Sequence, residues 1–216
     1  MQLFERLVSS TNGKKTLGAV SGSFMAGWLV LHVLGNFTAF EGPSRMDGYA
    51  AALRGLGSLL WLVRGLLVAA VAVHVVVTVS LARRARAARP VHATRRWPRS
   101  HVASRTAIVG GPLLLVFVTY HLLHMTFGVA RPAFDPRHVH ANLVSGLVSP
   151  LVATVYVFGA LLVGFHLHRG LASALASVGS TRATSTTSRA VFAAIAVLVA
   201  AGFAAIPIAV LAGVVR

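Results

Sequence analysis

The stretch Leu56–Leu81, LGSLLWLVRGLLVAAVAVHVVVTVSL, decides the fold class of this 216-residue chain. Apart from Arg64 and His74 it contains no charged or titratable residue. About 20 helical residues cross a hydrocarbon core of about 30 Å, so this stretch is long enough to span a membrane. The whole chain is 56% hydrophobic and 11% charged, with a mean hydropathy of +0.77. Such a composition predicts an integral membrane protein.

Other apolar stretches of similar length lie on both sides of this one. The polar or proline-rich segments between them cannot continue a span. We therefore expect an all-α integral membrane protein, a single membrane domain over residues 1–216, with five transmembrane helices. Their approximate ranges are 16–40, 56–81, 105–127, 143–168 and 190–214.

The distribution of Lys and Arg predicts how the helices are oriented. Of the 20 cations, three lie before the first span, eight lie in and at the end of the second loop, from Arg83 to Arg105, and three lie in the fourth loop. Because positive loops remain inside, the N-terminus is predicted to be cytoplasmic and the C-terminus outside. Against these stand only 4 acids, and the sequence pI is near 12. The cations occupy short segments between spans, which indicates topology signals and phospholipid headgroup contacts rather than a nucleic-acid surface.

Cysteine is absent from the chain. Disulfides, iron–sulfur clusters, thiolate ligation of haem and covalent attachment of haem are therefore excluded. The chain also lacks a dinucleotide-binding glycine motif, so no flavin site is expected. Any redox chemistry in this chain would need a cofactor held by histidine.

Histidines are unusually frequent within the predicted spans. A polar ring at membrane depth is costly unless it faces the bundle interior, so each is a functional candidate. The first four spans each place a histidine near their C-terminal end. Since successive spans run in opposite directions, His32 and His121 are predicted in the outer half, and His74 and His166 in the inner half.

Two pairs of histidines at two levels fit two haem b groups. Each haem iron needs two axial ligands on opposite faces of the macrocycle, and bundle cores build such sites from facing helices. We therefore expect the first four helices to form a dihaem bundle, with haem iron bound by His32 and His121 and by His74 and His166. The two levels would be roughly 10–16 Å apart. Zinc is a weaker interpretation, because no short-spaced ligand set is present.

Some details of this site stay open at this stage. His124 lies three residues after His121, and helical periodicity does not choose between them as the ligand. His124 is a weaker alternative ligand, or a contact to a haem propionate, a quinone or another helix. Small residues on the ligand faces would let a porphyrin enter between helices; these are Gly35, Gly159 and Gly170. The other histidines are expected at an interface or in loops: His168, His92, His101, His138 and His140.

Several sequence fragments surround the four histidines and run through most of the chain. They are SSTNGKK at Ser9–Lys15, LHVLGNF at Leu31–Phe37, GYAAAL at Gly48–Leu53, ARP at Ala88–Pro90, SRT at Ser104–Thr106, YHLLHMTFG at Tyr120–Gly128, FDPRHVHANLV at Phe134–Val144 and FHLHRGLASALASVG at Phe165–Gly179. In their order and spacing, these fragments resemble the dihaem cytochrome b subunit of succinate dehydrogenases and fumarate reductases, the kind with one large anchor polypeptide.

The resemblance implies a specific role in respiration. It implies that His32 and His121 ligate the outer haem, and His74 and His166 the inner one. A flavoprotein subunit and an iron–sulfur subunit would bind on the cytoplasmic side, and electrons would pass through both haems to a membrane quinone, menaquinone rather than ubiquinone. The setting would be a bacterial plasma membrane, and the complex could assemble further. The chain would thus be an electron-transfer subunit without a succinate site of its own.

The chain departs from the family pattern in two places. Arg169 stands where the family often has a second histidine before glycine, and neither Glu41 nor Asp47 is convincingly placed as the acid used in quinol chemistry. Two alternatives also remain. One is another dihaem cytochrome b, such as a hydrogenase or formate dehydrogenase anchor; the other is a small transporter whose histidines relay protons or bind a metal ion.

Overall fold

The computed structural model describes residues 5, 8–88, 100–177, 179 and 185–216, and within these it is helical without strands. Five helices are long and apolar enough to cross a membrane, as the sequence predicts. They are α2 (Thr11–Asn36, continued by the 3-10 turn η1, Phe37–Glu41), α4 (Ser58–Ala87), α5 (Ser100–His121, continued by the π-helical turn η2, Leu122–Thr126), α7 (Pro150–Ser177) and α8 (Thr186–Leu211).

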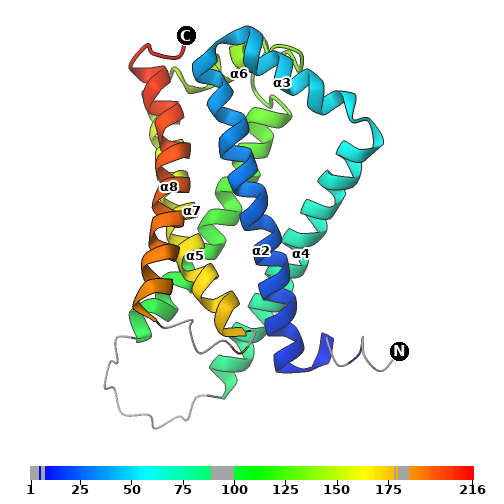
Figure 1. Cartoon of the computed structure of the whole chain (residues 1–216), viewed down its shortest axis with the longest axis vertical. Coiled ribbons are helices and arrows are strands. Elements are labelled where there is room, and N and C mark those ends of the chain that lie inside the picture. The colour runs from blue at the N-terminus through cyan, green and yellow to red at the C-terminus, as the bar shows by residue number, and fades with distance from the viewer. Residues whose placement is uncertain (1–4, 6–7, 89–99, 178, 180–184) are drawn as a thin grey trace.

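Two shorter helices were not predicted. They are α3 (Pro43–Gly55) and α6 (Val139–Leu147), and both lie at the end of the bundle that carries the C-terminus (Figure 1). The N-terminus lies at the opposite end. Helix α2 packs against α4, α7 and α8, while α4 diverges from α2 toward α3 (Figure 1).

Helix boundaries differ from the predicted spans for local reasons. The predicted span 143–168 begins inside α6, but this helix ends at Leu147 and α7 starts at Pro150. Proline has no N–H to donate and is tolerated in the first turn of a helix, so it starts α7 instead of continuing α6. Helix α4 runs past the predicted end at Leu81 to Ala87, with Arg84 and Arg86 in its last turn, where cations favour a helix C-terminus.

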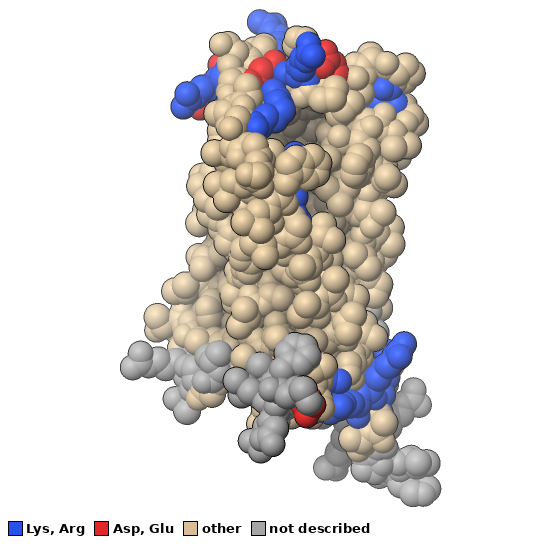
Figure 2. Space-filling view, turned by 90° about the vertical axis from the view of Figure 1, so that its right-hand side faces the viewer, with Lys and Arg blue, Asp and Glu red and all other residues tan. Residues whose placement is uncertain are grey.

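The surface has the pattern of a multi-pass membrane protein. Large apolar side chains are exposed along the long helices; Leu151 is 76% and Trp61 69% exposed. Figure 2 shows a middle zone largely free of Lys, Arg, Asp and Glu on this face, with charged residues gathered toward the two ends. In water this much exposed apolar surface would be unfavourable, whereas lipid tails cover it without cost.

Helix α8 is an integral part of the bundle and packs closely on α7. A Cβ at Gly164 of α7 would lie 2.7 Å from Ala200 Cβ and 3.1 Å from the Ala196 carbonyl oxygen. Such a close approach needs a small residue, as is common between membrane helices. Val163 and Leu167 of α7 are buried with Val199 of α8 in one core cluster. The fifth helix therefore closes one side of the four histidine-bearing helices.

Candidate functional site

The structure brings the four predicted histidines together as two pairs. The ring centres of His32 on α2 and His121 on α5 lie 5.9 Å apart, with an interplanar angle of 82°. Those of His74 on α4 and His166 on α7 lie 6.2 Å apart, with an angle of 69°. Each pair joins two helices that are not consecutive spans. This is the pairing that the depth of the residues in their spans predicts.

The separation within each pair suits two axial ligands of one metal ion. A metal ion binds an imidazole nitrogen at about 2 Å, so two imidazoles on opposite sides of one ion have ring centres about 6 Å apart. Among the described residues, no three His, Asp or Glu side chains gather as a metal site of their own. Two-histidine sites match haem, since the porphyrin supplies the other four nitrogens.

Aromatic rings surround the His32–His121 pair. The Trp28 ring stacks parallel to His32 at 6.4 Å, and Phe203 of α8 lies 5.7 Å from His32. Phe117 and Tyr156 lie 6.2 and 5.8 Å from His121. An apolar wall of this kind limits water access, which is one of the levers that set a haem potential. The contact from Phe203 was not foreseen, because no histidine marks the fifth span.

Helix α2 holds the side chain of His74. The Gly18 carbonyl oxygen lies 3.2 Å and the Ser21 hydroxyl oxygen 3.3 Å from His74 Nδ1. A carbonyl only accepts hydrogen bonds, so Nδ1 carries the proton and Nε2 keeps its lone pair free for a metal ion. Gly22 lies alongside, and a Cβ there would come within 3.2 Å of His74 Cε1.

A π-helical turn separates the two candidates on α5. It spans Leu122–Thr126 and is closed by the bond from Phe127 N to Leu122 O, 3.0 Å. A π-helix turns about 80° per residue and an α-helix about 100°, so His124 lies roughly 115° from His121 around the axis instead of about 60°. The sequence offers no signal for this turn.

His124 consequently faces different neighbours from His121. Its Nδ1 lies 2.9 Å from the Tyr156 hydroxyl of α7, and its ring stacks on Tyr120 at 5.4 Å. The sequence left several contacts open for His124, and the structure shows one of them, the hydrogen bond to another helix. His121, by contrast, faces His32.

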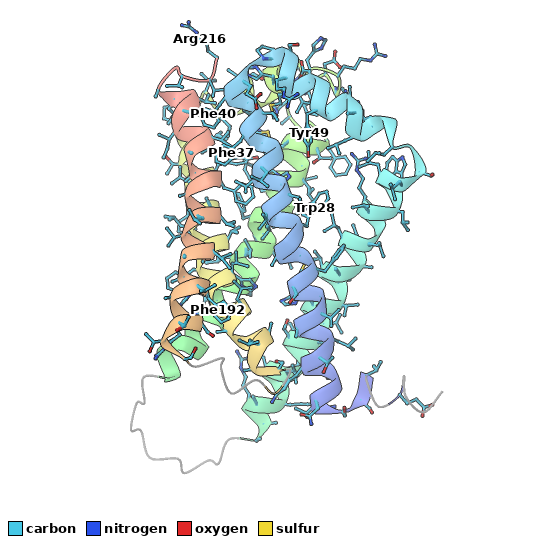
Figure 3. The ribbon with its side chains drawn as sticks, in the orientation of Figure 1. Trp28, Phe37, Phe40, Tyr49, Phe192 and Arg216 are labelled. Atoms are coloured by element: carbon cyan, nitrogen blue, oxygen red, sulfur yellow. The ribbon has the colours of Figure 1, made fainter. Side chains whose placement is uncertain are left out.

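The glycines expected beside a porphyrin have other neighbours. Tyr49 of α3 folds back against Gly35, where a Cβ would lie 2.8 Å from its ring (Figure 3). The Phe117 ring fills the space beside Gly159, at 2.2 Å from a Cβ built there. A Cβ at Gly170 would meet nothing within 4 Å. Two other glycines, Gly18 and Gly22, lie directly against the candidate ligand His74, and neither was predicted from the sequence.

The remaining histidines and acids belong mostly to the end that carries the C-terminus. The prediction that His140 and His101 lie in loops is wrong: His140 is in α6, only 3% exposed, and the backbone at His101 is in α5. The backbone N–H of His140 donates to Asp47 Oδ1 at 2.9 Å, which joins α6 to α3. His138 is exposed and bonds Asp135 at 2.9 Å. His92 lies outside the described residues.

Arg131 links the π-helical turn to α6. Its guanidinium donates to the carbonyl oxygen of His124 at 3.3 Å and to the Ser145 hydroxyl at 2.8 Å, and it also contacts the carbonyl oxygen of Asn142. Its Cζ lies 5.6 Å from the centre of the Phe134 ring. Burial lowers the pKa of Arg131 below its ordinary value. These contacts hold the turn after His121 in place.

We expect Arg131→Ala to destabilise this end of the protein. The loss of several charge-assisted hydrogen bonds from a half-buried guanidinium would cost about 1–3 kcal/mol. The measurement is the thermal unfolding midpoint in detergent, with the exposed Arg137→Ala as the matched control. Equal midpoints for the two variants would contradict this role.

In comparisons with known proteins, no family model, no curated protein and no solved structure matches the chain.

Proposed function

We propose that this chain is the membrane-anchor cytochrome b subunit of a succinate:quinone oxidoreductase. In this role it passes electrons from an iron–sulfur subunit through two haem b groups to a membrane quinone, menaquinone by the sequence resemblance. The observation that supports the proposal is the arrangement of four histidines, each from a different span, as two pairs. The ring centres lie 5.9 Å apart in one pair and 6.2 Å apart in the other.

The residues fit the groups they would hold. His32 with His121, and His74 with His166, would each supply two axial imidazoles to one haem, and the haem supplies one-electron chemistry when bound. The protonated Nδ1 of His74 leaves Nε2 available as a ligand. The chain's own residues orient these imidazoles, and the aromatic side chains around His32 and His121 keep water away from them.

The charges support an orientation in the membrane, and the sequence resemblance suggests the partners. The end that carries the N-terminus is basic, so by the positive-inside rule it faces the cytoplasm of a bacterial cell. Contacts from α4 to α2 and to the segment just before it give this end a defined shape: Lys14 Nζ donates to Ser80 Oγ at 2.6 Å, and Arg84 Nη2 donates to the Ser9 carbonyl oxygen at 3.0 Å. The iron–sulfur subunit, carrying the flavoprotein, would dock here.

Different observations support the two halves of this proposal. The paired histidines support a dihaem cytochrome b, while the fragments around them, such as SSTNGKK and YHLLHMTFG, support succinate dehydrogenase over a hydrogenase or formate dehydrogenase anchor. The soluble proteins that accompany the chain separate these classes.

The test is a reduced-minus-oxidised optical spectrum of the detergent-purified protein, with a pyridine haemochrome assay for haem per chain. Two b-type haems per chain support the cytochrome, and a colourless protein would overturn it in favour of a transporter. Co-purification of a flavoprotein with succinate:quinone activity then supports the succinate assignment. Hydrogenase or formate dehydrogenase activity in its place would contradict it.

A further inference from the structure

One turn of α2 is shaped around the side chain of His74. The Gly18 carbonyl and the Ser21 hydroxyl both lie within hydrogen-bond distance of His74 Nδ1, at 3.2 and 3.3 Å. Gly22 leaves room for the ring, because a Cβ there would lie 3.4 Å from the same Nδ1 and 3.2 Å from Cε1. Gly18, Ser21 and Gly22, which lie within about one and a half turns of α2, therefore all lie against the imidazole of His74.

The hydroxyl of Ser21 acts as an acceptor toward His74. Its single proton is committed to the Leu17 carbonyl oxygen at 2.7 Å, a bond shorter than the 3.3 Å to Gly18 O. A hydroxyl whose proton is used in this way presents lone pairs to other neighbours. Ser21 is only 7% exposed, so water does not compete freely for these lone pairs. The Nδ1–H of His74 is thus shared between two oxygens of α2.

The other three histidines lack this support. Within the part of the chain that the structure describes, no hydrogen bond reaches the side chains of His32, His121 or His166, which make ring contacts instead. Hydrogen bonding to the second ring nitrogen makes an imidazole a stronger electron donor and fixes its rotation. Of the four proposed haem ligands, His74 is therefore the one whose second ring nitrogen has hydrogen-bond partners among the described residues.

We propose that Ser21 is a positioning residue that, together with the Gly18 carbonyl, fixes the orientation of His74 and lowers the reduction potential of the haem it would bind. This inference rests on the proposed function. Electron donation from the ligand stabilises the ferric state, so each hydrogen bond to Nδ1–H shifts the potential downward.

The test is a redox titration of the two haems in Ser21→Ala. One haem is expected to shift upward by about threefold to tenfold in its reduced-to-oxidised ratio at fixed ambient potential, or roughly 30–60 mV at 59 mV per tenfold change. The other haem should keep its potential. Ser21→Thr retains the hydroxyl and should restore most of the wild-type value. The ferric low-spin electron paramagnetic resonance signal of the same haem should change in Ser21→Ala, because ring rotation is less restricted.

Ser80→Ala is the matched control. Ser80 is also a small polar residue at the contact between α2 and α4, but it bonds Lys14 and not His74. An upward shift in Ser21→Ala alone supports the inference. An unchanged potential at full haem content, or an equal shift in Ser80→Ala, would overturn it.

The inference and the proposed function fail in different ways. If the wild-type protein contained no haem, both the proposed function and the inference would be wrong. If the wild-type protein contained two haems and their reduction potentials were unchanged in Ser21→Ala, the inference alone would be wrong. The protonation of Nδ1 can also be read without activity, from the nitrogen chemical shifts of the histidine rings in labelled protein compared with those of His74→Gln.

Discussion

A His74→Ala variant is expected to carry one haem b, where the wild-type protein would carry two by the proposed function. The same result is expected for His166→Ala, because the two rings, whose centres lie 6.2 Å apart, are the proposed axial ligands of one haem. A haem that loses one of its two axial ligands is held at the iron by a single imidazole, which weakens its binding enough for it to be lost. Pyridine haemochrome analysis measures the loss directly.

Electron entry should fail in the same variants. The His74–His166 pair lies nearer the basic end, where the soluble subunits would dock, so electrons from the iron–sulfur subunit would reach this haem first. We expect succinate:quinone activity of the complex to fall by on the order of tenfold or more, since axial ligation is the main bond that holds the haem. The remaining haem should keep its spectrum.

His168→Ala provides the control for this prediction. His168 is on α7, two residues after His166, and is exposed. Its removal tests whether any histidine near this end of α7 affects haem content. Retention of both haems in His74→Ala, or loss of one in His168→Ala, would contradict the assignment.

The sequence predicts the helices well because their signal is local. An apolar run of span length needs no information about the rest of the fold, and all five such runs are helices in the structure. The pairing of the histidines could also be predicted, since position within a span and alternating direction fix the level of each residue. His32 therefore meets His121, and His74 meets His166, as expected.

Features that depend on contacts between distant segments could not be predicted in this way. Helices α3 and α6 are joined through Asp47 and the backbone of His140, which are 93 residues apart. Phe203 reaches His32 because α8 packs directly on α2, where a Cβ at Gly202 would lie 2.6 Å from Val33 Cγ2. Ser21 and Gly22 look like ordinary small residues of a membrane helix until α4 lies beside them. The π-helical turn at Leu122–Thr126 is a local feature, yet no residue pattern in the sequence marks it.

That turn leads to the second large effect, a difference between two histidines three residues apart. By the proposed function, His121→Ala is expected to remove the haem that the His32–His121 pair would hold and to leave the other haem in place. His124→Ala is expected to retain both haems. The reason is geometric: the π-helical turn directs His124 to the Tyr156 hydroxyl at 2.9 Å, while the ring centre of His121 lies 5.9 Å from that of His32.

The two variants serve as controls for each other, because each removes one imidazole, His121 from the end of α5 and His124 from the turn η2 that continues it. His124→Ala should still lower thermal stability by about 1 kcal/mol, since it breaks a hydrogen bond between α5 and α7. Tyr156→Phe removes the same hydrogen bond from the other side, so it should match that loss and also retain both haems. If His124→Ala lost one haem and His121→Ala kept two, the ligand on this helix would be His124, and the π-helical turn would have to rearrange when haem binds.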